Sequence, residues 1–196
     1  MPTAEIVTIG TELLLGITQD TNTQFLAEKL NKLGVDLFRT TTIGDNSHRI
    51  SQAIQEAFNR ADIVITSGGL GPTIDDPTRE AVANAFQETL VFHPELWEGI
   101  RSRFEKMGRL MTENNRRQAF IPQSARAIEN EVGTAPAFML ENGNKILICL
   151  PGVPAELEYI FQTAIAPLLI QKYHLHQIIF SRLSTPVGLG NPKWMR

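Results

Sequence analysis

The sequence predicts an α/β protein with three layers, in which a mostly parallel β-sheet lies between two layers of helices, together with a small α+β insertion. Two observations lead to this fold class. Short apolar runs rich in β-branched residues alternate with longer segments whose apolar residues recur at helical spacing. Successive parallel strands need crossover connections, which are right-handed in nearly all proteins, and helical crossovers cover both faces of the sheet.

Three strands are expected in the first half of the chain, at residues 4–9, 35–43 and 62–66. The first and third are continuous apolar runs, as expected of strands that are buried on both faces, and the second is rich in β-branched and aromatic residues. Ligands of parallel sheets collect beyond the carboxyl ends of the strands, so the glycine-bearing segments that follow these strands are expected to meet. Those segments are 10–16, 44–46 and 68–76.

Helices are expected between and after these strands. Residues 23–33 carry apolar side chains at helical spacing, and Gly34 closes the helix. Ser47 is the expected cap of a second helix with one apolar face. A third helix is expected at residues 77–86, directly after the last of the glycine-bearing segments.

The second half of the chain predicts helices, a hairpin and a second strand-to-helix turn. Residues 94–119 are expected to be helical, and the turn Asn142-Gly143 predicts a hairpin that ends with a strand at 145–150. Residues 150–156, Leu-Pro-Gly-Val-Pro-Ala-Glu, then turn into another helix. Residues 1–170 are expected to form one domain. Residues 171–196, with a late strand at 177–183, are expected to begin a connecting segment.

Composition argues against several classes of protein. The 196 residues are 42% hydrophobic and 20% charged, which is typical of a soluble globular domain. No run approaches the roughly 18 apolar residues of a membrane span and no secretory signal is present, so a cytoplasmic protein without membrane contact is expected. The net charge of -3 argues against binding of duplex nucleic acid. Cys149 lies in an apolar run and is expected to be a packed hydrophobe.

The segment 67–76, Ser-Gly-Gly-Leu-Gly-Pro-Thr-Ile-Asp-Asp, is the strongest functional signal, and we call it the glycine loop. Glycines let the backbone turn tightly and approach a ligand, and successive N–H groups at the start of a helix form a site for anions. It is neither a Walker loop nor a dinucleotide fingerprint. Ser67, Thr73 and Thr78 add hydroxyl donors. The residues of this segment and the following helix that are expected to bind the ligand are Gly68, Gly69, Gly71, Pro72, Thr73 and Thr78.

Two carboxylates end the glycine loop, and they predict a metal ion. Asp75 and Asp76 would repel a phosphate unless a divalent cation lay between them. Asp76 has an alternative role, because Asp-Pro is a good helix start with Asp76 as cap and Pro77 in the first turn. Asp75 has no such structural role and is the first expected metal ligand.

Four further polar residues each have two interpretations. Asp20 either caps the next helix or reaches the site, and Asp45 is either a turn residue or a ligand. Arg116 either binds a phosphate group or belongs to a solvated helix face. Glu156 either caps its helix or reaches the site.

Taken together, these segments resemble the CinA family of competence/damage-inducible proteins, in order across residues 4–190. The matching segments are 10–16, 20–22, 42–46, 66–81, 108–119, 133–136 and 150–156. The resemblance implies the molybdopterin-binding-like fold, which is shared with molybdenum-cofactor biosynthesis proteins. It also implies hydrolysis of ADP-ribose, a pyrophosphatase activity that needs a divalent metal such as Mg, Mn or Co.

The resemblance also implies roles for individual residues. The loop glycines and Thr73 would hold phosphate, and Asp75 and Asp76 would serve the metal. Candidate general bases are Glu12, Asp45 and Asp75. The residues expected to line the nucleotide pocket are Asn22, Asp45, Pro151 and Gly152.

Two alternatives remain at this stage. One is a domain that binds a nucleotide or molybdopterin without turnover, and the other is a molybdopterin adenylyl- or molybdenum-transfer enzyme, because fold analogy alone does not separate these functions. The segment 108–118 favours the CinA family. Members of this fold are often homo-oligomers, so a homo-oligomer is expected, although no residue pattern identifies its interface.

The chain departs from the family at its end. The family carries a separate C-terminal domain that deamidates nicotinamide mononucleotide, and this domain is absent from the 196 residues, so no deamidase activity is expected. Residues 188–196 also differ from the usual Gly-Ile/Leu-Gly-Glu-Ser. Insertion of one base into one possible coding of this segment restores that motif. We therefore hypothesise a frameshift, which sequencing the gene and its downstream frame would test.

Overall fold

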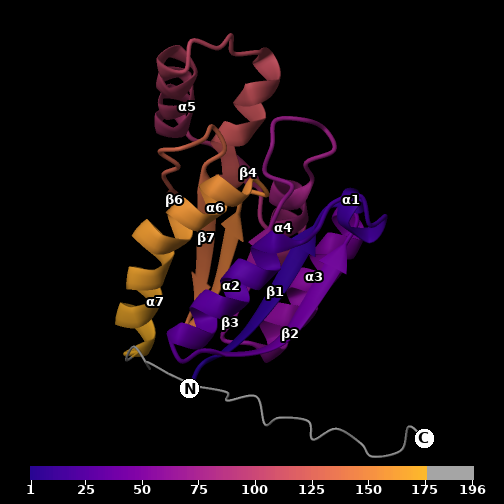
Figure 1. Cartoon of the computed structure of the whole chain (residues 1–196). Coiled ribbons are helices and arrows are strands. Elements are labelled where there is room, and N and C mark those ends of the chain that lie inside the picture. The colour runs from indigo at the N-terminus through magenta and orange to yellow at the C-terminus, as the bar shows by residue number, and fades with distance from the viewer. Residues whose placement is uncertain (176–196) are drawn as a thin grey trace, which may run out of the picture.

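The structure, a computed structural model, describes residues 1–175 and has a six-stranded main sheet (Figure 1). Strands β2, β1, β3 and β8 are parallel, and β7 runs antiparallel to both β8 and β6. In spatial order the strands are β2 (Asp36–Ile43), β1 (Thr3–Ile9), β3 (Ile63–Ser67), β8 (Lys145–Leu150), β7 (Ala137–Asn142) and β6 (Arg126–Ile128).

Helices cover both faces of this sheet (Figure 1). Helix α2 (Thr21–Lys32) lies on one face with a continuous helical segment near the end of the described chain, made of α6 (Pro154–Ile160), the π-helical turn η2 (Phe161–Ile165) and α7 (Ala166–Tyr173). Helices α3 (Ser47–Arg60) and α4 (Thr78–Phe86) lie on the other face. The predicted three-layer α/β fold is confirmed.

Two hydrophobic cores follow from the alternation of side chains along the central strands. In β1, Ala4 and Ile6 pack with α2 and α6, whereas Val7 and Ile9 pack with α3 and α4. Successive strand residues point to opposite faces, so a strand covered on both sides must be apolar at nearly every position. This requirement explains why these strands were visible in the sequence as continuous apolar runs.

A small outer part, which corresponds to the expected α+β insertion, lies beyond one end of the main sheet (Figure 1). It contains helix α5 (Pro94–Lys106) and a two-stranded antiparallel sheet of β4 (Leu90–Phe92) and β5 (Phe120–Pro122). Residues 94–119 are not helical throughout, because an irregular segment separates α5 from the 3₁₀-helix η1 (Glu113–Ala119).

Other expectations from the sequence need correction or lie outside the description. Asn46, not Ser47, caps α3, because its side-chain oxygen accepts from Arg49 N at 3.0 Å. The hairpin turn lies one residue later than expected, since Asn142 still pairs with Lys145. The late strand at 177–183 and the altered ending at 188–196 lie outside the described residues. Within residues 1–175, no helix has the length and apolar character needed to span a membrane.

Candidate functional site

A cleft of about 650 Å³ opens at the carboxyl ends of β1, β3 and β8, and we call it the main cleft. The three expected glycine-bearing segments do meet here, joined by the turn after β8. Parallel neighbouring strands place these loops side by side, although they are far apart in sequence. Of the predicted site residues, those lining the main cleft are Glu12, Asp45, Gly68, Gly69, Gly71, Pro72, Thr73, Asp75, Asp76, Pro151 and Gly152.

Close backbone packing shapes the start of the glycine loop. Gly68 has a φ of +105°, and a Cβ there would lie 2.2 Å from the carbonyl oxygen of Ile9. Its N–H donates to Leu150 O at 3.1 Å. On the other side, a Cβ on Gly152 would lie 3.3 Å from Gly68 Cα. Glycine therefore lets the ends of β1, β3 and β8 approach one another at the floor of the cleft.

Four successive carbonyl groups of the glycine loop, those of residues 68–71, accept hydrogen bonds from the start of α4. Thr78 donates its Oγ1 hydroxyl to Gly68 O at 2.8 Å and its N–H to Gly69 O at 3.2 Å. The next two carbonyls, of Leu70 and Gly71, accept from the Arg79 guanidinium at 2.8 and 2.5 Å. Thr78 itself is fully buried, so it supports the loop and does not line the cleft.

Three N–H groups of the same loop, unlike its carbonyls, lack a hydrogen-bond partner in the described part of the chain. Those of Gly69, Leu70 and Gly71 donate to no acceptor among residues 1–175. Backbone N–H groups are nearly always satisfied in folded proteins, by protein, solvent or ligand. Three successive unpaired donors that border a cleft at the end of a strand therefore suit an anionic ligand.

Arg79 is a site-supporting residue that sequence reasoning missed. Only 2% of it is exposed, and burial lowers the pKa of its guanidinium to about 10, with the charges of Glu80 and Asp76 opposing that shift. Its planar group spans two consecutive carbonyls, which suits arginine better than lysine. In the sequence it resembles any charged residue on a helix surface.

The two aspartates at the end of the glycine loop are arranged differently from one another. Asp76 Oδ2 accepts from Thr73 N at 2.9 Å and from Thr73 Oγ1 at 2.5 Å. The cap position of α4 is Pro77, without any side-chain cap bond, so the alternative of Asp76 as helix cap is wrong. Asp75 is exposed at the rim. Within residues 1–175, no three His, Cys, Asp or Glu side chains gather closely enough to hold a metal by themselves.

Glu12 and Asp45 come from two further loops, and both line the cleft. Asp45 Oδ2 accepts from Thr11 N at 2.9 Å, and Asp45 N donates to Thr11 Oγ1 at 3.1 Å, which ties the turn after β2 to the short helix α1 (Thr11–Leu14). Glu12 folds back on Gly10, where a Cβ would lie 2.5 Å from its Oε1. Contacts within these loops therefore hold in place the backbone that carries the two carboxylates.

Asn22 and Arg116 do not line the main cleft. Asn22 is buried on α2, and its Nδ2 donates to Ser67 Oγ at 3.0 Å and to Gly152 O at 2.8 Å, so it holds two walls together. Arg116 lies with its guanidinium 5.0 Å from the centre of the Phe92 ring, and its side chain is 54% exposed. Asp20 caps α2 by accepting from Thr23 N at 2.9 Å, which confirms its structural interpretation.

Glu156 is placed in the main cleft and does not cap its helix, whose cap position is Val153. Its Oε2 accepts from Asn130 Nδ2 at 2.5 Å, and the same amide donates to Ala135 O. A Cβ on Gly133 would lie 2.0 Å from Glu156 Cδ, so the glycine makes room for the carboxyl group. Burial raises the pKa of Glu156, and the bond from Asn130 partly opposes that shift.

Three other residues that line the cleft were missed: Gln118, Thr134 and Ala135. They come from η1 and from the loop before β7, which approach the cleft only through tertiary packing. The segments 108–119 and 133–136 were among those that carried the family resemblance, and that was the only signal for these three residues. Cys149, by contrast, is fully buried as expected, and burial raises the pKa of its thiol to about 12.

Comparison with known proteins agrees with this architecture. Residues 5–171 match the family described as "probable molybdopterin binding domain". The CinA-like protein of Kosmotoga olearia is 46% identical over 187 residues, which cover 95% of this chain and 45% of that protein. A CinA-like protein of Dictyoglomus thermophilum is 46% identical with the same shares covered. The chain thus spans less than half the length of these curated relatives.

Solved structures give the same picture. The CinA protein of Thermoplasma acidophilum superposes with a TM-score of 0.77 at 34% identity, covering 85% of this chain and 98% of that chain. A molybdopterin biosynthesis protein from Mycobacterium abscessus shares the fold, with a TM-score of 0.58 at 20% identity and 87% and 92% of the two chains covered. The expected molybdopterin-binding-like fold is confirmed. The chain therefore belongs to the molybdopterin-binding domain family and, within it, to the CinA-like proteins.

Proposed function

We propose that the main cleft binds a nucleotide diphosphate and that the protein hydrolyses ADP-ribose to AMP and ribose 5-phosphate with the help of a divalent metal. One observation carries the proposal. Four successive carbonyls of the glycine loop are fixed by Thr78 and Arg79, while three successive N–H groups beside the cleft have no acceptor in the described part of the chain. Such a loop receives a diphosphate without rearranging, because its geometry is set by the protein. The choice of ADP-ribose rests on the family resemblance.

The acidic residues of the cleft fit a metal that is shared with the substrate. Mg²⁺ is usually held by one or two carboxylates together with substrate phosphates and waters, and not by an all-protein cage. Asp75 at the rim and Asp76, whose Oδ1 has no donor among the described residues, match that pattern. The ion would be Mg²⁺, Mn²⁺ or Co²⁺, and it would neutralise the charge of the diphosphate and favour attack by water.

The chain's own groups then have three tasks in this proposal. The loop N–H groups orient the diphosphate and stabilise its charge. A carboxylate accepts the proton of the attacking water while the bridging P–O bond breaks and the released phosphate takes up the negative charge. Glu12, Asp45 and Asp75 are candidates for that role, and Glu156 joins them because it lines the cleft with a raised pKa. Asn130 would hold the Glu156 carboxyl group in place through its bond to Oε2.

A second candidate is recognition of a nucleotide or molybdopterin without turnover. It is favoured by the match of residues 5–171 to the family described as "probable molybdopterin binding domain". Under this alternative the loop would bind the same phosphate groups, and the carboxylates would serve affinity only.

Incubation of the purified chain with ADP-ribose and each of the three metals, followed by measurement of AMP, separates the candidates. We expect AMP release by the wild type and a loss of at least about 100-fold in Asp75→Asn, a size typical for removal of a charge-stabilising group. Asp36→Asn is the matched control, because Asp36 is exposed at the opposite end of β2, and it should keep full activity. Binding of ADP-ribose without AMP release under any metal would favour the second candidate. Full activity of Asp75→Asn would remove the metal assignment.

A further inference from the structure

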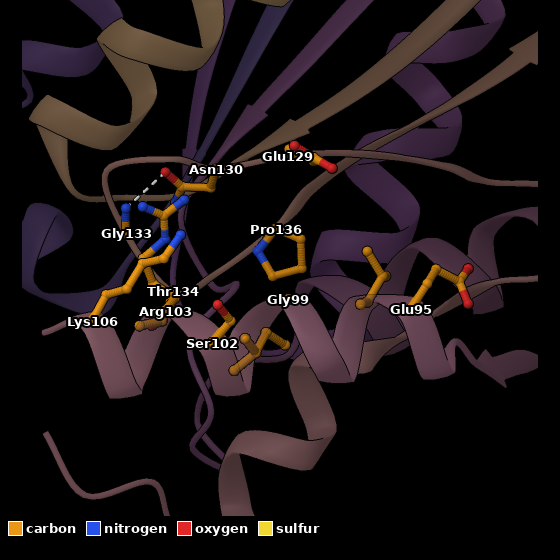
Figure 2. Close-up of a pocket in the computed structure, with 12 residues that line it drawn as sticks. Glu95, Gly99, Ser102, Arg103, Lys106, Glu129, Asn130, Gly133, Thr134 and Pro136 are labelled. Atoms are coloured by element: carbon orange, nitrogen blue, oxygen red, sulfur yellow. Dashed lines mark hydrogen bonds between the residues drawn. The ribbon is translucent and has the colours of Figure 1, made fainter. Parts of the chain in front are cut away.

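A second pocket, of about 210 Å³, lies between α5 and the segment 129–136, and we call it the α5 pocket (Figure 2). Figure 2 shows α5 along one side and the 129–136 segment crossing over it. The lining residues that the argument uses are Gly99, Ser102, Arg103, Lys106, Glu129 and Thr134.

Gly99 shows that α5 leaves this space open at a cost to its own stability. A glycine in a helix interior costs roughly 1 kcal/mol relative to alanine. Crowding does not explain this glycine, since a Cβ at Gly99 would meet no atom of residues 1–175 within 4 Å. The residue nevertheless lines the pocket, with Ser102 one turn further along the same helix face. The absent side chain therefore keeps space that another molecule can fill.

The charges of the α5 pocket are divided between its two ends. Arg103 and Lys106 lie beside Gly133 and Thr134, while Glu129 and Glu95 lie toward the other end (Figure 2). The guanidinium of Arg103 donates to the carbonyl oxygen of Glu131, which holds it against the 129–136 segment. The basic end suits a phosphate group, and carboxylates are common partners of ribose hydroxyls.

The α5 pocket adjoins the main cleft. Thr134 lines both, and Asn130 and Gly133, which line the α5 pocket, contact Glu156 in the main cleft. The basic end of the α5 pocket is the end beside this junction (Figure 2). A ligand with one phosphate of its diphosphate on the glycine loop would therefore extend toward Arg103 and Lys106 first and the carboxylates next.

We propose that the α5 pocket is a second substrate subsite, which holds the ribose 5-phosphate half of a diphosphate sugar nucleotide while the nucleoside monophosphate half stays in the main cleft. The phosphate lies toward Arg103 and Lys106, and the sugar occupies the space over Gly99 with its hydroxyls near Ser102 and Glu129. This inference rests on the proposed function for the position of the diphosphate.

Calorimetric titration of the full chain with ribose 5-phosphate and, separately, with AMP tests the subsite without requiring turnover. Gly99→Leu fills the pocket with a good helix former, and Arg103→Gln removes the charge at its basic end. We expect Arg103→Gln to weaken ribose 5-phosphate binding about tenfold, the size expected for loss of one charged hydrogen bond. Gly99→Leu should weaken it about as much, because its side chain occupies the pocket, and each variant should change AMP binding less than about twofold. Arg101→Gln is the control, because Arg101 pairs with Glu98 and Glu105 on the outside of the same helix and should bind like the wild type.

Several results would overturn the subsite. One is that the wild type does not bind ribose 5-phosphate. Another is that both variants keep the wild-type affinity, or that AMP binding falls as much as ribose 5-phosphate binding. Inorganic phosphate that binds as tightly as ribose 5-phosphate would exclude the sugar from the pocket. A wild type that binds both products but releases no AMP from ADP-ribose contradicts the proposed hydrolysis and leaves the subsite supported.

Discussion

Replacement of Gly68 by alanine tests whether the main cleft depends on close backbone packing. Two costs can be worked out from the structure. The φ of +105° disfavours any side chain by about 1–2 kcal/mol. The new Cβ would lie 2.2 Å from Ile9 O, and relieving such an overlap by moving backbone costs about 1–3 kcal/mol. The expected loss is about 2–5 kcal/mol, a large share of the roughly 5–15 kcal/mol that stabilises a typical domain.

Urea denaturation followed by circular dichroism measures this loss, and the melting temperature should fall by about 4–20 °C. Gly143→Ala is the matched control. Gly143 has a φ of +60°, but a Cβ there would meet no atom of the described residues within 4 Å, so only the backbone cost of about 1 kcal/mol is expected. If Gly68→Ala is destabilised by less than about 1 kcal/mol more than Gly143→Ala, the contact between Gly68 and Ile9 does not constrain the loop and the reasoning is wrong.

Three further predictions concern side chains in or near the cleft. Arg79→Met should lower the free energy of unfolding by about 2–4 kcal/mol in the same assay, because it leaves the Leu70 and Gly71 carbonyls without their donor. Arg79→Lys should not restore that stability. A Met variant within about 0.5 kcal/mol of the wild type would contradict this reasoning. Cys149 should react with a thiol reagent only after denaturation, because it is fully buried and its pKa is raised to about 12, so rapid labelling of the native protein would count against the structure. Burial raises the pKa of Glu156, so its neutral form is favoured in the folded protein. The wild type should therefore lose stability relative to Glu156→Gln as the pH rises through that raised pKa. Below the usual carboxyl range the pH should not change the difference in stability between the two proteins. Melting temperatures of both proteins at about pH 4 and about pH 8 check this, and a difference that is independent of pH would refute it.

The sequence predicted the parts of the fold whose physical causes are local. Strands β1 and β3 were visible because burial on both faces requires apolar residues throughout, and α2 because its apolar residues repeat at helical spacing. Strands β4, β5 and β6 were missed because each has only three residues, which is too short for any periodicity.

In the candidate site, too, the sequence predicted only the features whose residues lie close together along the chain. The glycine loop was identifiable because glycines, hydroxyls and carboxylates lie together in one segment. Arg79 and Gln118 were not, because a charged or amide residue on a helix gives no local sign that the fold will bury it against a loop carbonyl. Asp76 looked like a helix cap by its position before Pro77, and only the bonds to Thr73 decide against that.

The bonds that hold the cleft together also bear on how the protein folds. Gly68 N donates to Leu150 O, and Asn22 donates to Gly152 O across a sequence separation of 130 residues. Contacts this distant form late and slowly, because a long loop must close before they contribute. The glycine loop should therefore acquire its native shape only when β8 joins the sheet. A fragment that ends after α4 would contain the whole loop sequence and still lack the floor of the cleft.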